Sequence, residues 1–205
     1  MCTNGQTMKR TCRLLFFSFT LFCANARSHE GHQSKENPPT PLLTESIYNL
    51  SSKWKTQDNK EISLSELRGH PAFLAMVYSN CEHACPVIVE DMKRIENALP
   101  AKIKSNFSFY LFSFDSVRDI PAQLKKFSQS KKLDSHQWTL FHGSERAVRE
   151  LAAVLAIHFK KDSKGDFDHS NLISLIDAEG LIRHQQLGLN QNPEEILQKV
   201  NELKP

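Results

Sequence analysis

Two continuous apolar runs mark the body of the chain, at residues 72–79 (AFLAMVYS) and 107–114 (FSFYLFSF). Runs of this length without polar alternation are typical of strands that are buried on both faces. Upstream, residues 45–69 alternate apolar and polar positions around a polar turn at Asp58-Asn59, which predicts two short strands joined by that turn. The first half of the body therefore contains strands whose two faces must both pack against other elements.

Apolar residues at helical spacing follow each buried run and predict three helices. The first lies between Pro86 and Pro100, and its apolar positions are Ile88, Met92, Ile95 and Leu99. The second opens at Pro121 and carries Leu124 and Phe127. The third begins near Ser144 and carries Val148, Leu151 and Leu155.

The C-terminal part predicts a hairpin and a last helix. Residues 171–177 (NLISLID) and 181–187 (LIRHQQL) flank the turn AEG, which is a hairpin signal. The helix is expected to start with Asn192 as its cap, Pro193 at its first position and Glu195 completing a capping box.

The order of these elements is strands, helix, strand, helices, hairpin, helix. An α/β sandwich of the thioredoxin-like type fits this order best, with a central mixed sheet, helices on both faces and an antiparallel hairpin at one edge.

The N-terminus changes how the composition is interpreted. Basic residues, Lys9, Arg10 and Arg13, precede a ten-residue apolar run and the small residues of ANA, which together indicate a signal peptide cleaved after Ala26. The run is too short to span a bilayer, so no stable membrane anchor is expected. We therefore divide the 205 residues into a cleavable signal peptide (1–26), a flexible polar leader (27–44) and one globular domain (45–205).

Cleavage removes both the excess charge and three cysteines. The 26 basic residues lose three and become 23, equal to the 23 acidic residues, so the charge gives no indication of nucleic-acid binding. Cys2, Cys12 and Cys23 are lost as well, and the mature chain keeps only Cys81 and Cys85. We expect this pair to be exported, most naturally to a bacterial periplasm, where disulfides can form.

Cys81 and Cys85 are predicted at the junction where the buried strand 72–79 ends and a helix begins. Sites in open α/β sheets lie at the carboxyl ends of strands, and a helix N-terminus stabilises thiolate. A purely structural disulfide would close a very small loop and stabilise by only about 2 kcal/mol. A redox pair or a metal site remains, and copper suits soft thiolate and imidazole ligands, whereas zinc would want a fourth ligand.

Of nine histidines, His169 is the best third ligand. It is expected in a loop just before strand 171–177, and in a thioredoxin-like sheet that loop faces the cysteine junction. Its alternative interpretation is an ordinary surface histidine. His83, inside the cysteine loop, is a further candidate that we expect to point to solvent.

Four segments in order, YSNCEHACP, FSFDSVRDIP, WTLFHG and DFDHSNLISLIDAEG, make residues 45–203 resemble the SCO/SenC family. That resemblance implies a thioredoxin fold and copper handling in the bacterial periplasm or mitochondria. It implies that Cys81, Cys85 and His169 are copper ligands and that Asp115 is an acidic residue close to them. On its own, Asp115 also fits a turn at a strand end.

The resemblance further implies a metallochaperone that delivers copper to a partner, such as a subunit of cytochrome c oxidase or another periplasmic copper protein. The chain departs from many members at Glu82, where they have proline, and at Ser116, where they often have proline too. It also lacks the membrane anchor that many carry, according to our interpretation of its N-terminus.

The alternative is a thiol–disulfide oxidoreductase that reduces the cysteines of a copper-site client, with Cys81 and Cys85 as its catalytic pair. Three residues separate the two cysteines, whereas a thioredoxin-type motif has two. No proline lies between Pro121 and Pro193, so the cis-proline that usually faces such a motif has no counterpart before strand 171–177.

A second copper site is conceivable at the mature N-terminus. Cleavage after Ala26 would expose Arg27-Ser28-His29, whose amine, two amides and imidazole can form a square-planar Cu(II) site. The alternative is that His29 belongs to a polar leader without a metal.

Overall fold

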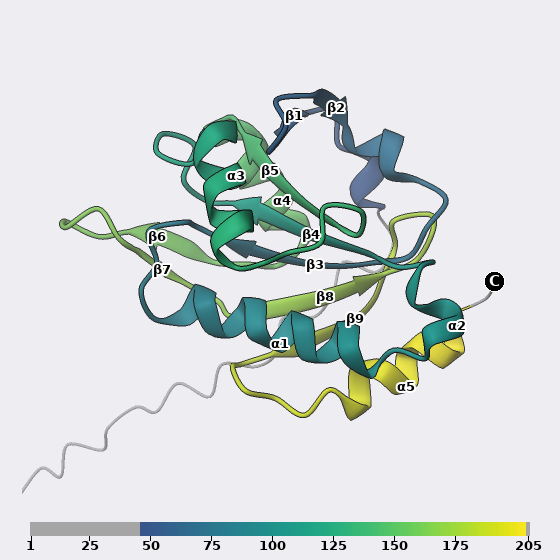
Figure 1. The fold of residues 1–205 in the computed structure, drawn as a ribbon. Helices are drawn as coiled ribbons and strands as arrows, with labels where there is room; N and C mark the ends of the chain where they lie inside the picture. Colours follow the sequence, from purple (N-terminus) through teal and green to yellow (C-terminus); the bar gives the residue numbers. More distant parts are fainter. Residues whose placement is uncertain (1–45, 204–205) are drawn as a thin grey trace, which may run out of the picture. The chain divides into compact units, whose positions relative to one another are not determined.

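A seven-stranded mixed sheet organises the part of the chain that the structure describes, residues 46–203 of a computed structural model (Figure 1). The expected signal peptide (1–26), the leader (27–44) and His29 lie outside the described residues. The strands run in the order β2-β1-β5-β4-β3-β8-β9. Their bounds are β1 Lys53–Thr56, β2 Glu61–Ser63, β3 Ala72–Val77, β4 Ser108–Ser113, β5 Trp138–Gly143, β8 Leu172–Ile176 and β9 Ile182–Leu187.

The two apolar runs form the centre of the sheet. β3 pairs in parallel with β4, and β4 pairs in parallel with β5. All six residues of β3 are buried, as the continuous apolar run predicts. β8 joins the other side of β3 in antiparallel register and continues through the predicted AEG turn into β9. The predicted α/β sandwich with a central mixed sheet is confirmed.

Helices cover both faces of this sheet. The helices are α1 Ala84–Ala98, α2 Ala101–Lys104, α3 Pro121–Ser130, α4 Glu145–Val154 and α5 Glu194–Glu202, with short 3-10 helices at Ile47–Asn49 and Leu64–Leu67. In Figure 1, α1 and α3 lie in front of the sheet and α4 lies behind it. α1 and α3 each connect adjacent parallel strands in the same direction, so the right-handed crossover rule places them on the same face.

The core between these layers is rich in aromatic rings. Phe109 stacks on Phe73 and on Trp138, with ring centroids 5.3 and 4.8 Å apart, so one row of rings crosses β3, β4 and β5. At the end of β5, Gly143 touches Trp54 of β1. A Cβ on Gly143 would lie 2.5 Å from the Trp54 ring, so only glycine fits there. Because this core is closely packed, the carboxyl-terminal ends of the strands are held in fixed positions.

Besides β5, for which the sequence predicts no strand, two details differ from the sequence prediction. α5 begins at Glu194, and the assigned cap is Pro193, although the Asn192 side chain does accept a hydrogen bond from the Glu194 N–H. No hydrogen bond among the described residues joins Glu195 to Asn192, and the Glu195 carboxylate lies 4.0 Å from His184 instead. The predicted capping box is therefore absent from this part of the chain.

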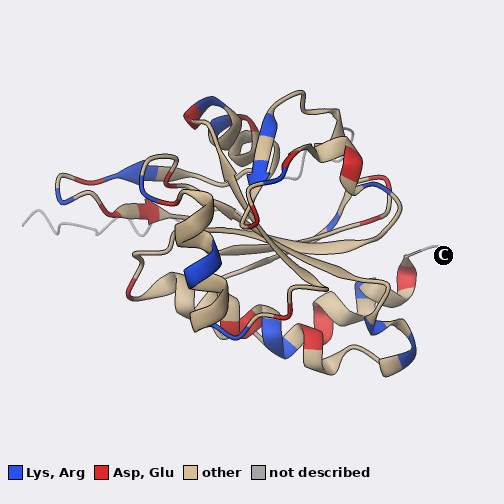
Figure 2. Ribbon diagram, turned by 45° about the horizontal axis from the view of Figure 1, so that its top comes forward, with Lys and Arg blue, Asp and Glu red and all other residues tan. Residues whose placement is uncertain are grey.

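The second difference is an additional hairpin. β6 (Phe159–Lys161) and β7 (Phe167–His169) pair with each other in a separate two-stranded sheet, in a segment that we expected to be a loop. The hairpin projects from one end of the fold in Figure 1, and Figure 2 shows basic and acidic residues following one another along it. Because charged residues occupy most of this hairpin, its sequence lacks the alternation of apolar and polar residues that would predict strands.

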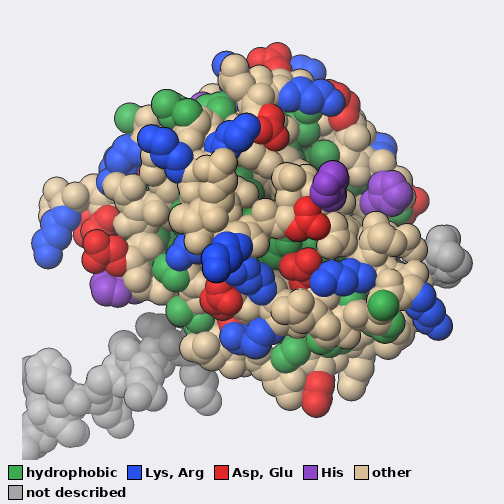
Figure 3. All heavy atoms as spheres, viewed as in Figure 1, with side chains coloured by type: hydrophobic (Ala, Val, Ile, Leu, Met, Phe, Trp, Pro, Cys, Tyr) green, Lys and Arg blue, Asp and Glu red, His purple; other side chains and the backbone are tan. Residues whose placement is uncertain are grey.

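The described surface mixes both signs of charge. On the face shown in Figure 3, Lys and Arg side chains are interspersed with Asp and Glu side chains. Several are paired at helical spacing, including Arg149 with Glu145 and Lys199 with Glu202. Within residues 46–203, none of the helices combines the length and the apolar character needed to cross a membrane.

Candidate metal centre

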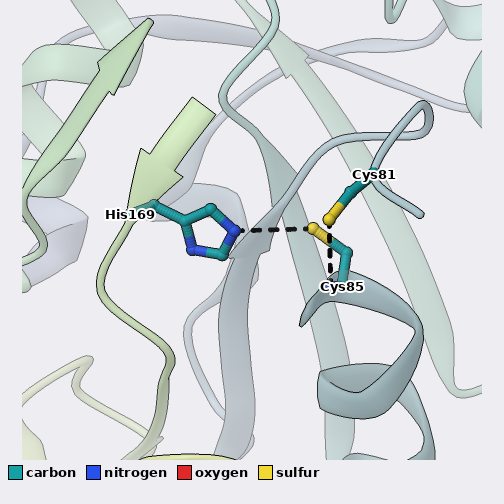
Figure 4. A group of neighbouring side chains, drawn as sticks. All are labelled: Cys81, Cys85 and His169. Carbon is teal, nitrogen blue, oxygen red and sulfur yellow. Dashed lines mark hydrogen bonds between the residues drawn. The ribbon is translucent and has the colours of Figure 1, made fainter. Parts of the chain in front are cut away.

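The two cysteines lie at the carboxyl end of the central strand, where the sequence predicts them. β3 ends at Val77, the chain turns outward, and Cys81 sits in the turn while Cys85 is the second residue of α1. Cys85 is completely buried, whereas Cys81 is partly exposed. Both are free thiols, and the Cys85 backbone N–H donates to the Cys81 sulfur over 3.2 Å (Figure 4).

His169 approaches the same point from the other side. It is the last residue of β7, and its Nε2 lies 3.7 Å from the Cys85 sulfur (Figure 4). Its Nδ1 lies 3.1 Å from the Ser170 carbonyl oxygen, which favours a proton on Nδ1 and leaves Nε2 free to accept or to bind a metal. We expected His169 in a loop; the structure places it in a strand, whose pairing with Phe159 fixes the direction of the imidazole.

The two sulfur atoms have opposite protonation preferences. The pKa of Cys81 is lowered to about 4, chiefly because its sulfur accepts a hydrogen bond from the Cys85 thiol, and also because it accepts the Cys85 backbone N–H. The pKa of Cys85 is raised, because its thiol donates that hydrogen bond and because it is buried. Without a metal, the pair therefore holds one thiolate at Cys81 and one thiol at Cys85.

A cleft of about 490 Å³ leads from solvent to the site. Its walls include Tyr78 and Asn80 on one side and Phe167 and His169 on the other. Cys81 lines this cleft, whereas Cys85 does not. His83 lies at the rim with an exposed side chain, as the sequence predicts.

Asp115 is not one of the three clustered ligand residues. Its buried carboxylate pairs with the Arg118 side chain and accepts the backbone N–H groups of Val117 and Arg118. Burial alone would raise the pKa of Asp115, but the bonds from Arg118 outweigh it and lower the pKa. Asp115 is therefore engaged by its own turn, as the turn-former interpretation holds.

Asp119, four residues further on, is the carboxylate that the sequence reasoning missed. It is buried and accepts hydrogen bonds from the Ser79 backbone N–H (2.9 Å), the Ser79 hydroxyl (2.5 Å) and the Ser113 hydroxyl (2.5 Å). Ser79 begins the turn that carries Cys81, so Asp119 anchors that turn. The sequence offered one weak signal, a second aspartate directly before Ile120 and the helix-opening Pro121.

The cluster has the size and chemistry of a metal site. The ligand atoms of Cys81, Cys85 and His169 all lie within 4.8 Å of one another, and this is the only such group of three found among the described residues. A metal bonded to sulfur at ~2.3 Å and to nitrogen at ~2.0 Å in a trigonal plane would separate those two atoms by about 3.7 Å. That agrees with the 3.7 Å between Cys85 and His169. Two sulfurs and one imidazole favour a soft ion such as Cu(I) over a hard one.

Sequence comparisons relate the chain to known proteins. The sequence model of the SCO1/SenC family matches residues 47–204. The SCO1 protein homolog of Bacillus subtilis (strain 168) is 27% identical over 143 residues, which cover 68% of this chain and 74% of that protein.

Solved structures show the same fold. BsSco, a member of the Sco family of cytochrome c oxidase assembly proteins, has a TM-score of 0.65 and 25% identity, over 80% of this chain and 95% of that one. Bradyrhizobium japonicum ScoI with copper bound has a TM-score of 0.62 and 23% identity, over 75% of this chain and 97% of that one. Because the family model matches well over half of the sequence, the chain belongs to the SCO1/SenC family.

Proposed function

We propose that this protein binds one copper ion through Cys81, Cys85 and His169 and delivers it to a partner protein. The observation that carries the proposal is the convergence of two sulfur atoms and one imidazole nitrogen within 4.8 Å. The copper carried by a relative of the same fold, Bradyrhizobium japonicum ScoI, supports the choice of metal. Cu(I) is the form that two thiolates and one imidazole hold best.

Transfer to a partner is supported by the position of Cys81. This sulfur lines an open cleft, so an incoming ligand from another protein can replace it while Cys85 and His169 still hold the ion. The partner that we propose is a copper-accepting protein, such as a subunit of cytochrome c oxidase. The description of BsSco as a cytochrome c oxidase assembly protein supports this choice. We further propose that residues 1–26 direct export to the periplasm.

A thiol–disulfide exchange activity is the second candidate, and the different protonation of the Cys81 and Cys85 sulfur atoms favours it. The Cys81 thiolate would attack a client disulfide, form a mixed disulfide and release one client thiolate. Cys85 would then lose its proton and attack the Cys81 sulfur, which releases the second client thiolate and leaves a Cys81–Cys85 disulfide. Two electrons pass to the client, and an external thiol must supply them again before the next cycle.

Anaerobic titration of the reduced protein with Cu(I), against a chromophoric chelator, tests the first proposal. We expect one ion per chain, and we expect His169→Ala and Cys81→Ser to lose at least tenfold in affinity, because each loses one of three ligands. His158→Ala is the matched control, since His158 is exposed and lies beside the same hairpin. Equal affinity of His169→Ala and the parent protein would contradict the proposed ligand set.

Disulfide reduction tests the second candidate on the same variants. If Cys81→Ser abolishes reduction of a protein disulfide while His169→Ala keeps it, the exchange activity is separate from metal binding. If the parent protein reduces no disulfide while it binds copper, the second candidate is rejected and the first stands.

A further inference from the structure

The hairpin that carries His169 has little support of its own. β6 and β7 contain three residues each and form a sheet separate from the main one. An isolated two-stranded hairpin is marginally stable at best in water. The position of the His169 imidazole therefore depends on what ties this hairpin to the body of the protein.

Aromatic packing supplies one part of that support. Phe114, just after β4, packs against Phe159 and Phe167, with ring centroids 5.2 and 6.1 Å apart. Its ring also lies 4.8 Å from the His169 ring. Tyr78, just after β3, meets the Phe167 ring at 5.1 Å, and its hydroxyl accepts the Phe167 backbone N–H over 3.4 Å. These contacts hold the strands of the hairpin near their base.

Arg118 supplies the other part, at the loop of the hairpin. Its side chain leaves the β4–α3 connection, and its Nη2 donates to the Gly165 carbonyl oxygen over 2.6 Å. The same guanidinium donates through Nε to the buried Asp115 carboxylate and lies over the Tyr78 ring at 5.8 Å. A planar guanidinium can make these three contacts at once, whereas an ammonium group cannot reproduce the geometry.

We propose that Arg118 is a positioning residue that clamps the β6–β7 hairpin to the body of the protein and thereby holds His169 beside the cysteines. Asp115 orients the guanidinium for this purpose and acts on the site only through it. The clamp can exist in the metal-free protein. Its consequence for copper rests on the function proposed above, because only then does opening of the hairpin remove a ligand.

Limited proteolysis of the reduced, metal-free protein tests the clamp directly. Trypsin can cut after Lys160, Lys161 and Lys164, which are exposed in the hairpin, once the hairpin opens. Loss of a hydrogen bond to a charged group should make opening about tenfold more frequent, and cleavage follows the open population when reclosing is fast. We expect Arg118→Gln to be cut about tenfold faster at these sites, and Arg118→Lys to recover little of the protection.

Arg149→Gln is the matched control. Arg149 lines the cleft that Phe114 and Lys160 also line, but its guanidinium pairs with Glu145 and makes no hydrogen bond to the hairpin among the described residues. Its cleavage should equal that of the parent protein. The urea midpoint of each variant shows whether an effect is confined to the hairpin, because a global loss of stability would expose all tryptic sites alike.

The second measurement is the release of Cu(I) from the loaded protein to excess chelator. If release begins with opening of the hairpin, Arg118→Gln should release copper about tenfold faster, in proportion to its faster cleavage, while Arg149→Gln behaves as the parent. Equal hairpin cleavage in Arg118→Gln and the parent, or faster cleavage at every site together, overturns the clamp. Faster hairpin cleavage with unchanged release overturns its link to His169. If the parent protein binds no copper, the proposed function fails, and the proteolysis alone decides whether the clamp exists.

Discussion

Replacing Cys85 by alanine should raise the pKa of Cys81. In the parent protein the Cys81 sulfur accepts hydrogen bonds from the Cys85 thiol and from the Cys85 backbone N–H, the latter over 3.2 Å. Alanine removes the first and keeps the second. A hydrogen bond to a charged group contributes about 1.5–3 kcal/mol, and about 1.4 kcal/mol corresponds to one pKa unit. The pKa of Cys81 should therefore rise from about 4 by roughly one to two units.

The pH profile of alkylation by iodoacetamide measures this shift in the reduced, metal-free protein. At pH 6 a thiol of pKa about 4 is about 99% thiolate, whereas an ordinary cysteine of pKa about 8.5 is about 0.3% thiolate. The low-pKa thiolate is also about a hundredfold less nucleophilic, since reactivity falls with basicity. Absolute rates at pH 6 should then differ only a few-fold, and the pH at which the rate falls to half is the decisive quantity.

Two results would refute this reasoning. The first is a Cys81 alkylation rate in the parent protein that climbs tenfold per pH unit between pH 6 and 8, as for an ordinary thiol. The second is an unchanged midpoint in Cys85→Ala, which would mean that the Cys85 thiol does not lower the pKa. The Cys81→Ser protein is the control, and we expect it to react very slowly because Cys85 is buried and its pKa is raised.

Three further predictions concern stability. The pKa of Cys81 is lower in the folded than in the unfolded protein, so its ionisation stabilises the fold. This contribution to the free energy of unfolding is fully present above pH ~8.5 and is lost as the pH falls through about 4. The urea midpoint of the reduced protein should therefore rise with pH between these values, and it should rise less in Cys81→Ser. Asp119→Asn should lower the free energy of unfolding by about 1–3 kcal/mol, because it weakens three hydrogen bonds to a buried carboxylate. Asp58→Asn, in an exposed pair with Lys125, should change it by less than about 1 kcal/mol. Equal effects of the two substitutions in urea unfolding would contradict the anchoring role. Gly143→Ala should destabilise the protein by about 1–3 kcal/mol, because its Cβ would meet the Trp54 ring. The alkylation profile of Cys81 should stay as in the parent, because Cys81 lies in the turn after β3, which β4 separates from β5. An unchanged melting temperature would show that the ring can move aside.

The sequence predicted most of the main sheet because its strands carry strong apolar patterns. Residues 72–78 and 109–114 are buried, and the AEG turn has a recognisable hairpin signal. No strand is predicted at β5, whose residues enter only as part of the family segment WTLFHG, because Thr139 and His142 interrupt its apolar pattern. The β6–β7 hairpin was missed because most of its residues are exposed and charged, so no apolar period marks it.

The candidate site likewise has a part that the sequence predicts and a part that it does not. The strand–helix junction, which places Cys81 and Cys85, follows from apolar pattern and proline position, both local properties of the sequence. The unlike burial and pKa of the two thiols depends on how α1 packs, which spacing alone does not encode. Likewise, Asp115 and Asp119 look equivalent in the sequence. Only the fold shows that Arg118 engages the first and Ser79 the second.

The burial of one thiol behind the other imposes an order on every encounter at this site. Cys81 and His169 line the cleft, whereas the Cys85 sulfur is buried behind them. A reagent, an ion or a partner's side chain that enters the cleft therefore meets the Cys81 sulfur before the Cys85 sulfur. Exchange at such a site is sequential: the outer sulfur is the first to bind an arriving group and the first to let a departing one go. The inner sulfur is then the last contact, so the molecule has a fixed direction of entry and exit within a pair of otherwise identical side chains.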